Sequence, residues 1–210
     1  MCFINSIEGK PSLISNEEQT ITYTGFKKTA TINEGDNSLE INYGVDDQRR
    51  KGVYKTNGET TLTRYYLGDY EEEQTADGKT WKIHYLSRGN GLAAIFVEEN
   101  DNAQLYYAYT DYLGSLTALT DKDGNVVEHQ AFDPWGNRRN PDDWTSLITT
   151  PISHITGRGY TMHEHLDDFA LINMNGRVYD PQIARFLSPD PQLQAPVYWL
   201  NYNRYGYCYK

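Results

Sequence analysis

Apolar and polar residues alternate along much of the first half of the chain. The alternation is clearest in segments 20–23, 39–43, 62–66, 81–85 and 105–109, where nearly every second residue is Ile, Leu, Tyr or Trp. This period of two is typical of a strand with one buried face. Residues 91–99, GLAAIFVEE, are continuously apolar over most of their length, which predicts a strand covered on both faces. We find no convincing helical periodicity over ten or more residues, and residues 163–169 are expected to form one helical turn at most.

The segments between these strands carry hairpin signals. Asn-Gly or Asp-Gly pairs, which supply the positive backbone angles of tight turns, occur at 57–58, 77–78, 90–91, 123–124 and 175–176. Aromatic residues that end successive strands recur at intervals of about 20 residues, at Tyr23, Tyr43, Tyr66, Tyr85, Tyr109 and Phe132. We therefore predict an all-β protein of tandem β-hairpin repeats.

The amino-acid composition restricts the core that the chain can form and the classes of partner that it can bind. Hydrophobic residues make up 38% of the chain and aromatic residues 13%, with 18 tyrosines, so amphipathic rings must build much of the core. A net charge of −10 argues against nucleic-acid and anionic-membrane partners. The sequence shows neither a membrane-spanning run nor a signal-peptide pattern, so we expect a piece of a larger secreted or cell-surface protein, or a cytoplasmic one. Cys2 and Cys208 are expected to be free thiols.

The densest motif is RVYDPQIARFLSPDP, residues 177–191. Its Asp-Pro pairs at 180–181 and 190–191 favour turns, because proline pushes the preceding residue out of the helical region. The turns should bring two arginines and two aspartates close together, either as structural ion pairs or as an active site. We predict a structural hub that consists of Tyr179, Ile183, Arg185, Phe186 and Leu187.

This motif resembles the signature of the RHS repeat-associated core domain, the C-terminal part of RHS/YD-repeat proteins. YTDYLGSLTALTDKDGNVVEHQAFDPWGN, residues 109–137, and RGYTMHEHLDDFALINMNGRVYDP, residues 158–181, are similar to the same family. The resemblance implies YD-type hairpins that form a curved, partial RHS-type β-shell. In relatives this shell encapsulates or presents a C-terminal toxin or effector.

The resemblance also implies a site. In self-cleaving relatives, an arginine and an aspartate at the motif positions of Arg177 and Asp190 belong to an aspartyl-protease-like site, and Asp180 is a weaker candidate for it. The second aspartate comes from a downstream Asp-Pro-x-Gly segment that this chain lacks, so the chain resembles a truncated core. We expect Arg177 and Asp190 to lie close together and to be catalytically inactive, because aspartyl catalysis needs two carboxyl groups.

The predicted organisation has four parts. Residues 1–18 form an irregular lead-in, 19–137 the hairpin repeats, 138–154 a loop or insertion, and 155–210 the partial RHS core. An incomplete curved sheet has two unpaired edges, which predicts self-association through strand edges or through an exposed aromatic concave face.

Other constellations are weaker. His163 and His165 could share a face and bind a metal, but no third ligand is identifiable, so no metal or cofactor is expected. The acidic run at 71–73 is expected to face water. Exposed tyrosines and Trp135, Trp144 and Trp199 could stack on sugars. The primary hypothesis is a structural shell protein, and the alternatives are an autoproteolytic core and a carbohydrate- or cell-surface-binding module.

Overall fold

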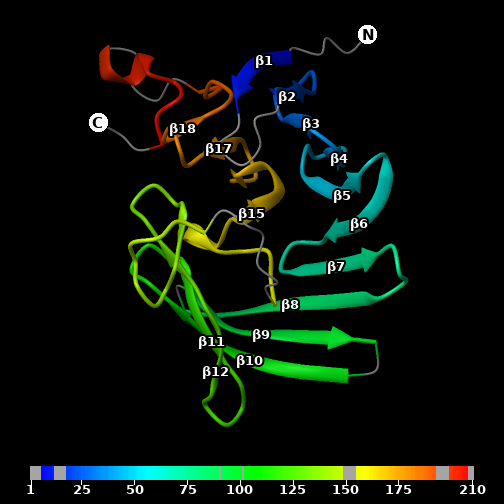
Figure 1. Ribbon diagram of the computed structural model, residues 1–210, viewed down its shortest axis with the longest axis vertical. Coiled ribbons are helices and arrows are strands. Elements are labelled where there is room, and N and C mark those ends of the chain that lie inside the picture. The colour runs from blue at the N-terminus through cyan, green and yellow to red at the C-terminus, as the bar shows by residue number, and fades with distance from the viewer. Residues whose placement is uncertain are drawn as a thin grey trace.

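The computed structural model describes residues 6–11, 18–89, 91–100, 102–148, 155–192 and 199–207. These residues form three antiparallel sheets, of which the largest has twelve strands that follow one another in chain order (Figure 1). Its strands are β1 (Ser6–Pro11), β2 (Glu18–Tyr23), β3 (Thr29–Glu34), β4 (Asn37–Tyr43), β5 (Arg49–Thr56), β6 (Glu59–Tyr66), β7 (Tyr70–Thr75), β8 (Thr80–Arg88), β9 (Gly91–Glu99), β10 (Asn102–Thr110), β11 (Leu116–Thr120) and β12 (Val126–His129).

Each strand of this sheet pairs with the next, and short turns connect β2 through β8. At the β5–β6 turn, Asn57 and Gly58 both have positive φ, 54° and 82°, as the Asn-Gly pair predicts. Gly78 and Gly124 also have positive φ in the β7–β8 and β11–β12 turns. The predicted all-β meander is therefore confirmed, although Asn90 of a further predicted turn lies outside the described residues.

The twelve-stranded sheet curves around a smaller sheet of four strands (Figure 1). The smaller sheet, which we call the core sheet, consists of β15 (Glu164–Leu166), β16 (Leu171–Asn173), β17 (Val178–Asp180) and β18 (Arg185–Phe186). A two-stranded sheet, β13 (Ala131–Phe132) with β14 (Arg138–Arg139), lies between them in the chain, and three short 3₁₀ helices accompany the core sheet: η1 (Tyr160–Met162), η2 (Asp167–Phe169) and η3 (Trp199–Tyr202).

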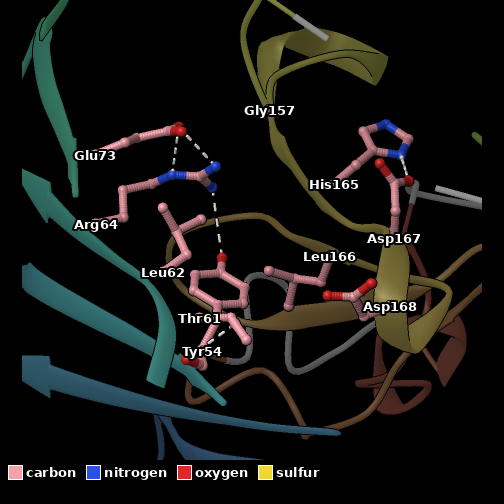
Figure 2. A pocket seen from close by; sticks show the side chains of 10 residues that line it. All are labelled: Tyr54, Thr61, Leu62, Arg64, Glu73, Gly157, His165, Leu166, Asp167 and Asp168. Atoms are coloured by element: carbon pink, nitrogen blue, oxygen red, sulfur yellow. Dashed lines mark hydrogen bonds and ion pairs between the residues drawn. The ribbon is translucent and has the colours of Figure 1, made fainter. Parts of the chain in front are cut away.

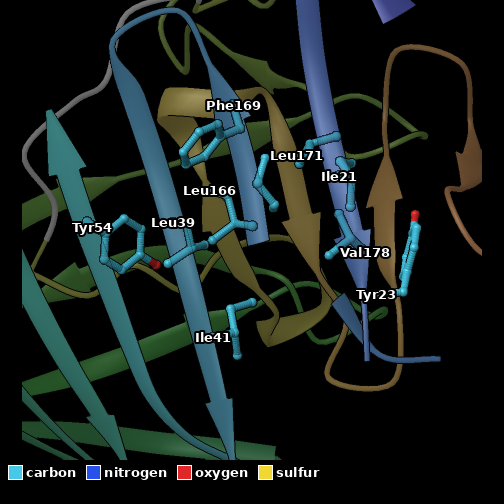
Figure 3. Packing of buried hydrophobic residues seen from close by; sticks show 10 residues of the cluster. Ile21, Tyr23, Leu39, Ile41, Tyr54, Leu166, Phe169, Leu171 and Val178 are labelled. Carbon is cyan, nitrogen blue, oxygen red and sulfur yellow. The ribbon is translucent and has the colours of Figure 1, made fainter. Parts of the chain in front are cut away.

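Apolar side chains join the two sheets. Figure 3 shows Leu166, Phe169 and Val178 of the core sheet region packed against Ile21 and Leu39 of the large sheet. A second buried cluster joins β8, β9 and β11 through Ile83, Tyr85, Ile95, Val97, Leu116 and Leu119. The concave face of the large sheet is thus a protein core rather than an exposed surface, and the predicted self-association through an exposed aromatic concave face is wrong.

The structure corrects two further predictions and leaves others untested. Ser6–Pro11 pairs with β2 as a strand, so this part of the predicted irregular lead-in is wrong. The prediction that residues 91–99 form a strand covered on both faces is also wrong. On β9, Ile95 and Val97 are buried against the core, whereas Phe96 and Glu98 on the opposite face are partly exposed, because no layer of the described part of the chain covers that face. Residues 163–169 contain β15 and one 3₁₀ turn, as expected.

Cys2, Cys208 and residues 149–154 of the predicted insertion lie outside the described residues. No helix of the part that the structure describes is long and apolar enough to cross a membrane.

Candidate functional site

The motif at 177–191 lies at the far edge of the core sheet, in β17, β18 and the turns around them. Tyr179 and Phe186 face each other across these two strands, with ring centroids 5.5 Å apart, and both are buried. Leu187 is half-buried and packs against the cluster that joins the two sheets. The backbone oxygen of Leu187 also accepts a hydrogen bond of 2.9 Å from the Tyr23 hydroxyl. Of the residues in the predicted hub, Tyr179 and Phe186 thus lie in one buried cluster, and Leu187 packs against a neighbouring one.

Ile183 and Arg185 do not belong to this hub. Ile183 is 51% exposed, and Arg185 is exposed as well, which corrects both assignments. The reason is the turn between β17 and β18, in which the Asp180 carboxylate accepts the backbone N–H of Gln182 at 2.9 Å and that of Ile183 at 3.3 Å. This turn directs Ile183 into solvent. Asp180 itself is fully buried and shapes the turn.

Arg177 and Asp190 lie within ion-pair distance. The guanidinium Nη2 of Arg177 is 3.0 Å from Oδ2 of Asp190, and its Nη1 donates to the backbone oxygen of Arg204 at 3.0 Å. The guanidinium also lies over the Phe186 ring, 3.7 Å from its centroid. Burial lowers the pKa of Arg177, and the attraction of Asp190 offsets this only in part. We call this contact the Arg177–Asp190 pair.

The same pair holds a later part of the chain. The Asp190 backbone N–H donates to the Arg204 oxygen at 2.8 Å, and Arg204 Nε donates to the Asp190 backbone oxygen at 2.6 Å. Beside it, Phe186 N–H donates to the oxygen of Tyr205 at 2.9 Å, and the Tyr207 ring packs 5.1 Å from that of Tyr179. The other Asp190 oxygen, Oδ1, accepts the backbone N–H of Gln192 at 2.9 Å. Both carboxylate oxygens are therefore engaged in fixing the chain.

A second charged site, which sequence reasoning missed, lies between the two sheets. Glu164 of β15 points to the large sheet, and its carboxylate accepts hydrogen bonds from the guanidinium groups of Arg49 and Arg64. The hydroxyls of Tyr54 and Tyr66 donate to Oε1 of the same carboxylate at 2.8 Å and 2.7 Å. We call these five residues the Glu164 joint. They are all buried, and they connect β5 and β6 to a strand about 100 residues later in the chain.

Within the Glu164 joint, neighbouring charges and a hydrogen bond outweigh the effect of burial on the pKa of Glu164. Burial alone would raise the pKa of Glu164, but Arg49, Arg64 and the Tyr66 hydrogen bond hold it well below its usual range. Burial and the Glu164 charge raise the pKa of Tyr54 and of Tyr66, so both hydroxyls stay protonated as donors. The Arg49 guanidinium stacks over the Tyr66 ring at 4.0 Å. The result is an anionic carboxylate enclosed by hydrogen-bond donors from four side chains.

Other inward-facing polar residues of the large sheet repeat this pattern. Glu71 accepts from the Tyr85 hydroxyl at 2.9 Å and from Arg158 Nε at 3.0 Å, and Glu73 forms an ion pair of 2.7 Å with Arg64. The prediction that the acidic run 71–73 faces water is therefore wrong for two of its three residues. Strand alternation explains the error, because only Glu72 lies on the outer face of β7.

A cavity of about 210 Å³ opens beside the joint, between β6 and η2. Figure 2 shows its wall, with Arg64 between Glu73 and Tyr54 on one side and His165 near Asp167 on the other. Gly157 lies directly against Arg64, since an added Cβ would meet the guanidinium at 3.0 Å. Three charged residues of this lining already have ion-pair partners: Arg64 and Glu73 pair with each other, and Asp167 pairs with Arg138.

The histidines of HEH do not assemble a metal site. Nε2 of His165 accepts the backbone N–H of Tyr160 at 3.0 Å, and its ring lies 5.2 Å from that of Phe132. Burial, together with Arg158 and Arg49, lowers the pKa of His163 to about 4. Within the residues that the structure describes, no three His, Cys, Asp or Glu side chains are grouped so that they could hold a metal ion.

These features define the class of protein as a repeat-built β-shell. A sheet of tandem hairpins curves around a small core sheet, and buried ion pairs connect the two sheets. The model of the Teneurin YD-shell family matches residues 13–207, and the chain belongs to this family. The chain is 24% identical over 184 residues to the tRNA3(Ser)-specific nuclease WapA of Bacillus spizizenii, a match that covers 85% of the chain and 7% of that protein. It is 27% identical over 184 residues to Salivary gland surface protein 1 of Aedes aegypti, with 80% and 5% covered.

Solved structures give the same fold. The crystal structure of TcdB2-TccC3-Cdc42 matches with a TM-score of 0.69 and 18% identity, over 90% of this chain and 9% of that one. The Photorhabdus luminescens Tc holotoxin pore matches with a TM-score of 0.69 and 17% identity, again over 90% and 9%. The chain spans less than a tenth of the length of these relatives. It is accordingly an RHS/YD-repeat protein with a shell-like structural fold.

Proposed function

We propose that this chain is a non-catalytic wall element of a YD-repeat shell, which encloses or presents a toxin-like or effector polypeptide in a secreted or cell-surface assembly. The observation that carries this proposal is the Glu164 joint, which fixes the core sheet inside the curve of the twelve-stranded sheet. Separation of the two sheets would leave buried Arg49 without a carboxylate and Arg64 with Glu73 alone, and breaking such buried ion pairs is costly. The joint therefore favours a rigid wall with a defined inside and outside.

A comparison of inner and outer positions tests this function. A photo-reactive amino acid replaces Asp168, whose exposed side chain lines the cavity on the inner side, or Thr63, which alternates with the inward Leu62 and Arg64 on β6. Both variants are made in the complete protein that contains this chain. We expect cross-linking in the producing cell to yield one defined polypeptide from Asp168 and not from Thr63. Equal cross-linking from both positions would contradict an enclosed or presented cargo.

Autoproteolysis is the second candidate, and the motif positions of Arg177 and Asp190 are the observation that raises it. The two residues occupy the motif positions expected from the resemblance, and they lie 3.0 Å apart. An aspartyl mechanism needs a second carboxyl group that shares a proton with the first. Here the two Asp190 oxygens are engaged by Arg177 and by the backbone of Gln192, which supports an inactive, structural pair. Intact-mass measurement over time separates the candidates, because only self-cleavage produces a new terminus.

A glycan-binding module is the third candidate. Trp135, Trp144 and Trp199 are all more than half exposed, so their rings are available to a sugar. A glycan array that compares the wild type with the three Trp→Ala variants tests this candidate. Binding that is lost in one of these variants would support a lectin-like role, and an empty array would remove it.

A further inference from the structure

A second cavity, with a volume of about 420 Å³, opens on the inner side of the large sheet. Its lining comes from the β6–β7 turn, from β8 and β9, and from residues 158 and 162. Small-molecule pockets usually have a volume of about 300–1,000 Å³, a range that the cavity of about 210 Å³ beside the joint does not reach. We call the larger cavity the rim pocket, because it lies next to the turns at one end of the strands. It has room for a small ligand.

Two partly buried side chains, Leu92 and Met162, give the rim pocket an apolar wall. Both pack against the buried cluster of β8, β9 and β11. Met162 follows Thr161 in a tight turn in which both residues have positive φ, 57° and 47°, and its N–H donates to the Gly159 oxygen at 3.0 Å. Positive φ is rare for a β-branched residue such as threonine, and it persists only where the surrounding structure holds it. The turn therefore fixes Met162 in the wall of the pocket.

Two polar side chains of the lining, Tyr85 and Arg158, already have partners. The Tyr85 hydroxyl donates to Glu71 at 2.9 Å and lies 2.6 Å from the Thr156 hydroxyl. Arg158 donates through Nε to Glu71 at 3.0 Å and through Nη1 to the backbone oxygen of Met162 at 3.3 Å. The buried carboxylate of Glu71 thus balances the charge of Arg158. Neither residue is left to attract an anionic ligand.

Two other side chains of the lining, Asp69 and Ser87, are exposed acceptors. Within the part of the chain that the structure describes, the Asp69 carboxylate and the Ser87 hydroxyl have neither a hydrogen-bond nor an ion-pair partner. The backbone of Asp69 is fixed, because its oxygen accepts the N–H of Tyr85 at 2.8 Å. Since Glu71 balances Arg158, the Asp69 carboxylate gives the rim pocket an uncompensated negative charge beside its apolar wall.

We propose that the rim pocket binds a primary alkylammonium group, carried by a lysine side chain of another polypeptide or by a free diamine. An ammonium has three donors and no acceptor, which complements the Asp69 carboxylate and the Ser87 hydroxyl. Its methylene stem packs along Leu92 and Met162, because such stems cover apolar surface while the charged end stays at a polar group. The unbranched thioether of Met162 adapts to the stem. This site goes beyond the proposed shell function and does not depend on it.

NMR of ¹³C-methyl methionine tests this proposal, because Met162 lines the pocket and Met174 is buried in a different cluster. The probe is Nα-acetyl-lysine methylamide, and the matched ligand without the ammonium is Nα-acetyl-norleucine methylamide. We expect the lysine probe to shift the Met162 signal saturably in the millimolar range, and the norleucine ligand to leave it in place. The Met174 signal should not move with either ligand.

The matched variants are Asp69→Asn and Asp77→Asn. Asp69→Asn should weaken binding of the lysine probe about tenfold, because it removes the charge that faces the ammonium. Asp77→Asn removes the same charge from an exposed position in the β7–β8 turn, at the other end of β7, and should leave binding unchanged. An unchanged Met174 signal shows that each variant is folded. Cadaverine separates the two sources: tighter binding of the lysine probe assigns the site to a polypeptide side chain, and tighter binding of cadaverine assigns it to a free diamine. Either result upholds the alkylammonium site.

Three results would overturn the proposal. The first is a Met162 signal that does not shift, or shifts without saturation, when the lysine probe is added. The second is an equal shift with the norleucine ligand, which would show apolar contact without recognition of the ammonium. The third is equal weakening by Asp69→Asn and Asp77→Asn, which would show that the probe responds only to the overall negative charge of the chain.

Discussion

The Glu164 joint and the Arg177–Asp190 pair use the same arginine–carboxylate chemistry in opposite settings. At the joint, Glu164, Arg49 and Arg64 are between 2% and 8% exposed, and the partners come from two different sheets. At the pair, Arg177 is 17% and Asp190 28% exposed, and both belong to one motif. Water can replace a partner lost at the pair but not at the joint. Burial therefore decides which ion pair holds the fold and which one only fixes a local segment.

The largest expected effect comes from breaking the joint. Glu164→Ala leaves buried Arg49 without a carboxylate and Arg64 with Glu73 alone, and removal of one partner of a buried ion pair costs about 3–5 kcal/mol. We expect this loss in the free energy of unfolding from urea denaturation, or failure to fold. Glu72→Ala is the matched control on the outer face and should change stability by less than about 0.5 kcal/mol. Equal midpoints for the two variants would show that the joint does not hold the sheets together.

A comparable effect is expected from the apolar hub beside the pair. Phe186→Ala removes a buried ring that contacts Tyr179, Tyr207 and the Arg177 guanidinium, and should cost about 3–5 kcal/mol. Ile183→Ala, three residues earlier in the same motif, should stay within about 0.5 kcal/mol because Ile183 lies in solvent. Denaturation midpoints measure both changes. A large loss for Ile183→Ala would mean that the β17–β18 turn packs against something else.

These two sites also show how far the sequence can be interpreted. Strand alternation and the Asn-Gly turns predict the hairpin meander, and the 177–191 motif predicts that Arg177 lies close to Asp190. The sequence can predict the meander and this contact because each depends on residues near one another in the chain. The Glu164 joint depends on contacts across about 100 residues, which no local period encodes.

A signal for the joint was nevertheless present in the sequence. Arg64 occupies an inward position between Leu62 and Tyr66, where an apolar residue is expected, and a charge at such a position calls for a buried partner. The alternation in 71–73 likewise placed Glu71 and Glu73 on the inner face, so their ion pairs were foreseeable once the face was assigned. Ile183 could not be placed in the same way, since a turn and not a period sets its direction.

A smaller loss in the free energy of unfolding is expected at acidic pH, through protonation of His163, the residue that precedes Glu164 of the joint. Burial, Arg158 and Arg49 lower the pKa of His163 from an unfolded value of about 6.5 to about 4, so the unfolded chain binds this proton first. Stability from the neutral imidazole is complete above about pH 6.5 and is lost as pH falls toward 4, by about 1–3 kcal/mol. Urea midpoints for wild type and His163→Gln between pH 7.5 and 4 measure this loss as their difference. Parallel pH profiles would contradict it.

The smallest effect is expected at the Arg177–Asp190 pair. Asp190→Asn keeps an acceptor for the Gln192 N–H but removes the charge that faces Arg177, which remains partly solvated and still donates to the oxygen of Arg204. We therefore expect a loss of only about 1 kcal/mol in the free energy of unfolding. Intact mass should stay constant over days for both wild type and variant, because Arg177 and the backbone N–H of Gln192 already engage the two carboxylate oxygens of Asp190. Arg177→Gln should have a similar effect on stability if the two residues act as one contact. A wild type that loses mass with time, together with an Asp190→Asn variant that does not, would instead show that the pair is catalytic and that weak burial at this site serves chemistry rather than local structure.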